Sequence, residues 1–342
     1  ELLHIEKMEL EIGYTLIPLV DADQGGDLLD RIIMTRRQAA VELGFIVPPI
    51  RIRDNMQLKP NQYSIKIKGL EVARGELAVD SYLVIGPGIE DDRELYGIDT
   101  VEPAFKLPAK WVDAQGREVA EAKGYTVVDP PSVIATHLTQ IIKERAHELL
   151  GRQEVQGMVD YIKEQNPAVV QELIPDLATI GDVQRVLCNL LQERIPIRDM
   201  ATILEAMADY ARLTKDPDIL TEYVRQALKR HITKKYADEN GCISVLTMDP
   251  SLEEYLREVL QPSDFGSYLV VDPARAQNMV QQINRYLETM TAQGKNVAIL
   301  CAPILRIYLR KLLDKFIPGI VVISYNEIET SVELDIVGMI SA

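Results

Sequence analysis

The residues that first suggest chemistry are Asp21 and Asp23 in "DADQGGDLLDRI", at the first and third positions of an EF-hand calcium loop. Such a loop needs an oxygen ligand at its fifth position and a bidentate carboxylate at its twelfth. Gly25 and Ile32 stand there instead, and neither can ligate calcium. The stretch therefore predicts a glycine turn with acidic residues before a helix, and we expect no metal site.

Two other glycine-containing stretches could bind phosphate groups. "GPGIED" lacks the third glycine of a dinucleotide fingerprint and opens no clear helix. "AQGKN" has a Gly-Lys pair, but neither the upstream glycine nor the following Ser or Thr of a phosphate loop. We predict that Gly294 ends a helix before the next strand, and we expect no cofactor.

The histidines and cysteines form no catalytic pattern. The four histidines are dispersed, without an H-E-x-x-H motif or zinc spacing, and the three cysteines are far apart and odd in number. These residues are His4, His137, His147, His231, Cys188, Cys242 and Cys301. We expect buried thiols in a reducing compartment and no catalytic residue, so the chain is predicted not to be an enzyme.

Length, charge and hydropathy argue against several other classes of protein. A chain of 342 residues is expected to form two to four compact units. The net charge of −15 argues against a nucleic-acid surface, which needs a basic field. Apolar runs such as "NVAILCAPIL" are shorter than the roughly 20 residues that span a bilayer. The chain begins with Glu1 rather than Met, which suggests a piece of a longer or processed chain.

One stretch, "DTVEPAFKLPAKW", is a candidate for recognition. It contains Phe105, one of only four Phe, and the single Trp111. Glu102 precedes Phe105 by three positions, and two prolines interrupt any helix. Scarce aromatics normally belong to the core, and we assign Trp111 to packing. Phe105 has two interpretations, because interface anchors are also aromatics ringed by polar groups.

A second polar residue lies on the helix predicted after Ser132, which we expect to be its N-cap. Ile134, Leu138, Ile141 and Ile142 form the apolar face of that helix. Thr136 lies about 200° around from Ile134. It is therefore predicted to be exposed near the start of the helix.

The elements around these residues predict a multidomain α/β fold. "YTLIPLVD" is predicted to be a buried strand, and the helix after it is closed by Gly44. The pattern loosens from about residue 86 to 118, and "GYTVVDP" restores a strand. This change predicts that residues near 80–129 are inserted into the first unit.

The second half is predicted to be helical and then α/β. Residues 151–235 carry amphipathic helices, among them one with Val183, Val186, Leu187, Leu190 and Leu191 on one face. Strands and helices alternate after 240, which indicates a mostly parallel sheet. The predicted divisions are 1–20, a linker remnant and first strand; 21–80 plus 130–150, the first α/β subdomain; 81–129, inserted; 151–235, helical; and 236–342, C-terminal α/β.

Several motifs in a fixed order give a resemblance to a known family. They include "GYTLIPLVDADQGGDLLDRI", "IRIRDNMQLKPNQYSIKIKG", "VEPAF", "GYTVVD", "SVIATHL", "GRQE" and "RIPIRDMATILE". The chain resembles the cytoplasmic domain of the FlhA export-gate family, which flagellar export shares with virulence type III secretion. The resemblance implies four subdomains, the second inserted into the first, and a nine-subunit ring at the cytoplasmic face of the bacterial plasma membrane.

The resemblance also implies a function and partners. Members dock export chaperones loaded with late substrates such as the filament protein, and order their export. Further implied partners are the soluble export ATPase complex, its stalk protein and other export-gate membrane proteins.

By motif, the implied chaperone site contains Glu102, Phe105 and Thr136. The family often has Asp where this chain has Glu102. An apolar hollow beside them would include Leu83, Ile85, Val128 and Val133, each of which could equally be core.

Two alternatives to a flagellar docking platform remain open from the sequence. One is the export gate of a virulence secretion system, which would share this architecture. The other is a nucleotide-binding enzyme that uses the C-terminal α/β unit.

Overall fold

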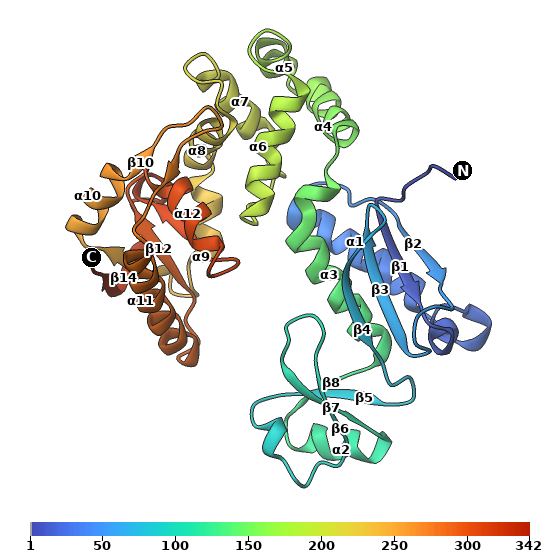
Figure 1. Cartoon of the computed structure of the whole chain (residues 1–342). Helices are drawn as coiled ribbons and strands as arrows, with labels where there is room; N and C mark the ends of the chain where they lie inside the picture. The colour runs from blue at the N-terminus through green and yellow to red at the C-terminus, as the bar shows by residue number, and fades with distance from the viewer. Residues whose placement is uncertain (1) are drawn as a thin grey trace. The chain divides into compact units, whose positions relative to one another are not determined.

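The computed structural model describes residues 2–342. The chain divides into two compact units (Figure 1). The first contains the chain up to Gly151 together with Pro196–Arg198, and the second contains Arg152–Ile195 and Asp199–Ala342. Sheets and helices alternate as predicted, so the predicted fold class, a multidomain α/β protein of four subdomains, is confirmed.

The first subdomain is a four-stranded sheet with two helices. The strand order is β2-β1-β3-β4, with β1 Met8–Ile12, β2 Ile50–Asp54, β3 Gln62–Ile67 and β4 Leu70–Glu76. Helices α1 (Leu28–Leu43) and α3 (Pro130–Leu149) pack on one another (Figure 1). Met8, Leu10 and Ile12 alternate along β1 and are fully buried, as expected for strand residues on the core face.

The predicted first strand, "YTLIPLVD", is wrong. Tyr14–Leu19 forms a 3-10 helix, η1, and a second one, η2, covers Ala22–Gln24. Pro18 lies inside η1 and cannot donate to a strand ladder. The strand lies earlier, at β1, in a stretch that the prediction had assigned to a linker remnant.

The predicted end of α1 is confirmed, and the predicted N-cap of α3 is corrected. Gly44 closes α1 in the left-handed region, with φ of 91°, as predicted. The cap of α3 is Asp129 rather than Ser132, because the Asp129 side chain accepts the N–H of Ser132. Pro130 and Pro131 fill the first helical positions, where no backbone donor is needed.

The inserted subdomain has a sheet of its own in the order β6-β7-β5-β8. Its elements are β5 Tyr82–Ile85, η3 Ile89–Asp91, β6 Ile98–Val101, β7 Pro108–Val112, α2 Ala114–Ala122 and β8 Thr126–Val128. Val84, Ile89, Leu95, Val112 and Ala120 form its core. Trp111 is buried between Leu83 and Ile98 in the register, so its packing role is confirmed.

The helical subdomain contains most of the helices of the second half. They are α4 Arg152–Gln165, α5 Pro167–Leu173, α6 Ile180–Gln192, α7 Met200–Tyr210, α8 Pro217–Ala227 and α9 Lys229–Tyr236. The predicted apolar face of α6 is fully buried. The run is not continuous, because Pro196–Arg198 pack with the first unit, where Ile197 N donates to Leu43 O at 2.8 Å.

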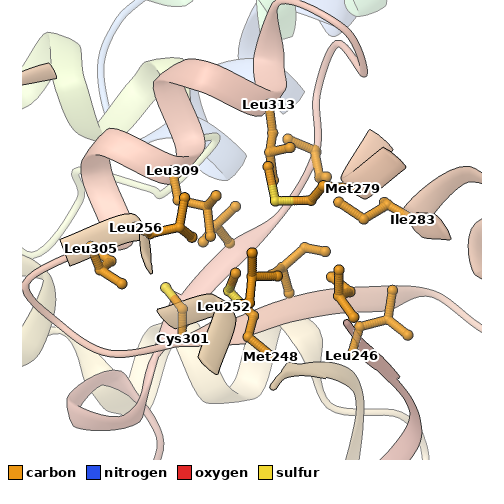
Figure 2. Packing of buried hydrophobic residues seen from close by; sticks show 14 residues of the cluster. Leu246, Met248, Leu252, Leu256, Met279, Ile283, Cys301, Leu305, Leu309 and Leu313 are labelled. Atoms are coloured by element: carbon orange, nitrogen blue, oxygen red, sulfur yellow. The ribbon is translucent and has the colours of Figure 1, made fainter. Parts of the chain in front are cut away.

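The C-terminal subdomain has a wholly parallel sheet in the order β13-β12-β9-β14. Its elements are β9 Cys242–Met248, α10 Pro250–Glu258, α11 Pro273–Ala292, β12 Val297–Cys301, α12 Arg306–Asp314, β13 Val322–Ser324, η4 Tyr325–Glu327 and β14 Glu333–Ile340, with a short hairpin of β10 Leu260–Gln261 and β11 Tyr268–Leu269. Leu305, Leu309 and Leu313 point into an apolar cluster with residues of the sheet and α11 (Figure 2). Gly294 follows α11 with φ of 72°, as predicted.

A buried ion cluster joins the helical and C-terminal subdomains. Arg306 is fully buried and contacts Glu193 at 2.7 Å and Glu222 at 2.6 Å, and Arg225 contacts Glu327 at 2.6 Å. Burial alone would raise the pKa of Glu193, but the guanidinium groups of Arg306 and Arg225 outweigh it and lower that pKa to about 2. The Glu193 carboxylate therefore stays charged opposite the arginines, whereas burial raises the pKa of Glu222 against the opposing effect of Arg306.

Candidate docking site

The hairpin loop between β6 and β7, residues 102–107, is called the docking loop below. Glu102 N donates to Leu107 O at 2.8 Å, and Lys106 N donates to Glu102 O at 2.9 Å. The Glu102 carboxylate accepts the N–H of Ala104 at 2.8 Å and that of Phe105 at 2.7 Å. The Glu102 side chain thus accepts hydrogen bonds from two backbone N–H groups of the loop and fixes the shape of the loop.

Glu102 therefore differs from the rim contact that the sequence predicted. It is only 3% exposed, and its oxygens already bind the loop. The structure corrects its place: Glu102 lies inside the loop, where its carboxylate holds the backbone of Ala104 and Phe105 in position. The one sequence signal for this was its spacing, three positions before Phe105.

Phe105 lies at the surface, with 55% of the residue exposed. Interior packing is therefore excluded for this side chain. The premise that scarce aromatics go to the core first fails for three of the four Phe, since only Phe45 is buried and Phe265 and Phe316 are exposed. An exposed ring on a loop with a fixed backbone is the arrangement expected of an interface anchor.

Thr136 is exposed on α3, as its position on the helix predicted. The next residue, His137, is buried, and its Nδ1 lies 2.7 Å from the hydroxyl of Tyr63 on β3. Ile134 and Leu138 are fully buried on the opposite face. The hydroxyl of Thr136 is thus presented on a helix whose other side is anchored in the first subdomain.

Charges on the docking loop influence two buried residues, His137 on α3 and Tyr63 on β3. Burial lowers the pKa of His137 to about 4, and the positive charge of Lys106 adds to the shift. Burial likewise raises the pKa of Tyr63, and the Glu102 carboxylate adds to it. The charges of Lys106 and Glu102 on the docking loop therefore act on His137, which follows Thr136, and on its partner Tyr63.

The four apolar residues of the predicted hollow divide into two pairs. Leu83 and Val133 are 1% and 2% exposed, so they are core residues, and this corrects their assignment to an exposed hollow. Ile85 and Val128 are partly exposed. Leu83 pairs with Val128 across β5 and β8, and α3 contacts β5, so these residues support the site from beneath.

A hollow of about 690 Å³ opens where the chain enters and leaves the inserted subdomain. Val128 lines it, together with Asp80, Tyr82, Arg117 and Asp129. Glu102, Phe105 and Thr136 do not line it. The structure therefore separates the exposed anchor from this hollow, which the sequence had treated as one site.

The sequence also missed exposed apolar residues around Phe105. Tyr96, Ile98, Val101 and Leu107 are 86%, 70%, 56% and 45% exposed. Their sequence pattern was weak, because β6 has only four residues and lies beside a loop bounded by Pro103 and Pro108. They extend the apolar surface from the docking loop along β6.

The buried His137 makes stability sensitive to pH. Its pKa is about 4 in the folded state against 6.5 ordinarily, so the folded state binds fewer protons and stability falls as pH drops below 6.5. We expect His137 to cost about 3 kcal/mol of unfolding free energy by pH 4. Urea unfolding of wild type and His137→Asn between pH 4 and 7 measures the difference. Parallel profiles for the two proteins would contradict this assignment.

The sequence also led to predictions about metal sites, membrane-spanning helices and thiols. Within residues 2–342, no group of three His, Cys, Asp or Glu is arranged to hold a metal ion. No helix in that range has the length and apolar character to cross a membrane. Cys301 is fully buried, as predicted, but Cys188 and Cys242 are partly exposed, which corrects the expectation for these two thiols.

The fold and the exposed loop define a multidomain α/β protein whose best-formed candidate site is a surface for binding other proteins. The FHIPEP family model matches residues 1–333. The chain belongs to the FHIPEP family.

Named relatives agree with this membership. The chain is 47% identical to "Flagellar biosynthesis protein FlhA" of Bacillus subtilis over 99% of its own length and 50% of the relative's. It is 39% identical to the protein of that name in Borreliella burgdorferi, over 97% of the chain and 47% of the relative. The chain therefore spans about half the length of these curated relatives.

Solved structures share the fold. The CdsV protein of Chlamydia pneumoniae has a TM-score of 0.84 and 29% identity, covering 98% of this chain and 97% of that one. Nonameric SctV-C of enteropathogenic E. coli (EPEC) has a TM-score of 0.78 at 23% identity, covering 98% of this chain and 99% of that one. The first matches in sequence and fold, and the second supports the fold alone.

Proposed function

We propose that this chain is the cytoplasmic docking platform of a flagellar type III protein export gate. It binds export chaperones loaded with late substrates and orders their export. The observation that carries the proposal is the exposed ring of Phe105 on a loop fixed by Glu102, beside the exposed Thr136. The chain's relatives named for flagellar biosynthesis support the flagellar assignment over the virulence one.

The mechanism we propose is recognition of an amphipathic helix. The chaperone presents an apolar side chain that packs on Phe105, and Thr136 orients it by a hydrogen bond. Glu102 acts through the loop and makes no contact of its own. Burying one large apolar side chain contributes roughly 1.5–3 kcal/mol, which suits a site that must later release its cargo.

The wider assembly is part of the same proposal. We place the chain at the cytoplasmic face of the bacterial plasma membrane, in a nine-subunit ring with other export-gate proteins. EPEC SctV-C, which shares this fold, is nonameric, and we propose the same arrangement for this chain. CdsV forms a complex with the CdsO protein, which supports binding of a partner protein by this fold. We propose that the soluble export ATPase complex and its stalk protein bind this chain. The role is docking, without catalysis.

A Glu102 series tests the proposal through the shape of the loop. Glu102→Asp retains a carboxylate and should bind a loaded chaperone nearly as wild type does. Glu102→Gln keeps one good acceptor and should bind about fivefold more weakly, as for one lost hydrogen bond. Glu102→Lys removes both acceptors and should bind weakest. Calorimetry with a flagellar chaperone–cargo complex measures the order, and equal affinities would remove Glu102 from the site.

A further inference from the structure

β6 is an outer strand with an unpaired edge. It pairs with β7 alone within residues 2–342. Glu102 and Leu107 form a hydrogen-bonded pair, and bonded and non-bonded pairs alternate along an antiparallel ladder. The bonded pairs are therefore Thr100–Ala109 and Ile98–Trp111. It follows that the backbone groups of Asp99 and Val101 point outward.

Pro108 supports this assignment independently. It lies opposite Val101 in the register, at a pair that exchanges no hydrogen bonds. A proline there costs the ladder nothing, because no N–H is needed from it. The outward amides of Asp99 and Val101 are thus free to pair with another strand.

Apolar side chains flank this edge on both faces. Ile98 lies on the face of Trp111, and Val101 lies on the opposite face, since side chains alternate along a strand. They are 70% and 56% exposed, and Tyr96 just before β6 is 86% exposed. An added strand would cover all three.

The other outer strands have features that natural proteins use to prevent an edge strand from pairing with another chain. On β2, Arg51 and Arg53 form ion pairs with Glu6 and Glu9. β4 has a register shift against β3 between Ile65 and Lys66, and β14 has one between Ile336 and Gly338. β8 and β13 are three residues long. β6 lacks a bulge and runs directly into the docking loop.

The exposed carboxylates near β6 indicate the charge of a segment that could bind at this edge. The Asp99 side chain is 81% exposed, and Glu90 and Asp91 are exposed on η3, which packs on β7. The chain as a whole carries a net charge of −15. An apolar segment with basic residues is therefore favoured at this edge.

We propose that β6 binds an extended, apolar and basic segment of the cargo that a docked chaperone carries, by strand addition. This inference rests on the proposed docking function. The cargo is the occupant because a docked chaperone helix has its own backbone groups paired, whereas an extended cargo segment has donors and acceptors to offer. The edge continues directly from the docking loop, so both parts of one complex can bind together.

The test compares Asp99→Pro with Asp99→Asn. Both remove the charge, but only proline removes the outward N–H. With a filament-protein chaperone carrying its cargo, Asp99→Pro should bind about fivefold more weakly than Asp99→Asn, as for one backbone hydrogen bond. With the empty chaperone, the two variants should bind equally. Thermal melting checks that Asp99→Pro is folded.

The outcomes separate this inference from the proposed function. Equal affinity of both variants for the loaded chaperone overturns strand addition, and an equal loss with the empty chaperone overturns the cargo assignment. Phe105→Ala should weaken both complexes, and if it weakens neither, the docking function fails instead. Should Asp99→Pro unfold, hydrogen exchange of the Asp99 and Val101 amides in wild type decides, with slower exchange in the loaded complex supporting strand addition and unchanged exchange refuting it.

Discussion

Arg306→Ala is expected to lower the free energy of unfolding by about 3–5 kcal/mol. The side chain is fully buried and pairs with Glu193 and Glu222, while its Nη1 also donates to Val322 O at 3.0 Å. Truncation would leave two carboxylates in the interior without their main partner, and that cost exceeds the value of the ion pairs themselves. Chemical denaturation followed by circular dichroism measures the loss.

A matched control lies on the same helix. Lys311 pairs with Asp218 at 2.5 Å, but its side chain is 52% exposed. Lys311→Ala should therefore change stability by no more than about 1 kcal/mol. If both variants lose the same free energy of unfolding, the burial of Arg306 does not explain how much its ion pairs contribute to stability.

Phe105→Ala is expected to weaken binding of a loaded chaperone by about ten- to a hundredfold, the value of one large apolar side chain buried at an interface. The unfolding free energy should stay within about 0.5 kcal/mol of wild type, because 55% of the residue is exposed. Binding and urea unfolding, measured on one preparation, separate the two effects.

Phe45→Ala is the comparison for this variant. Phe45 is 4% exposed, so the same substitution there should cost about 3–5 kcal/mol of stability. A stability loss of that size at position 105 would mean that Phe105 serves the fold. It would also remove the reason for assigning it to recognition.

Long, regular elements were predictable from the sequence. The apolar face of α6 and the parallel C-terminal sheet follow from strong periodicity. β6 and α2 were missed because elements of four and nine residues, in a stretch punctuated by glycine and proline, have too few repeats of the apolar pattern to detect. "YTLIPLVD" misled because a short apolar run does not distinguish a strand from a helix.

The candidate site was only partly predictable. Exposure of Thr136 followed from its angle to Ile134 on one helix. The burial of Glu102 did not, because it depends on how the loop folds back on its own carboxylate. The unpaired edge of β6 could not be predicted either, because the order of strands in a sheet depends on tertiary structure and is not determined by the local sequence.

The docking claim is tested most directly by calorimetric titration of a flagellar chaperone–cargo complex into the wild-type chain and into Phe105→Ala. We expect saturable binding to wild type and at least about tenfold weaker binding to the variant. Binding of equal strength to both proteins, or none to wild type, would contradict it.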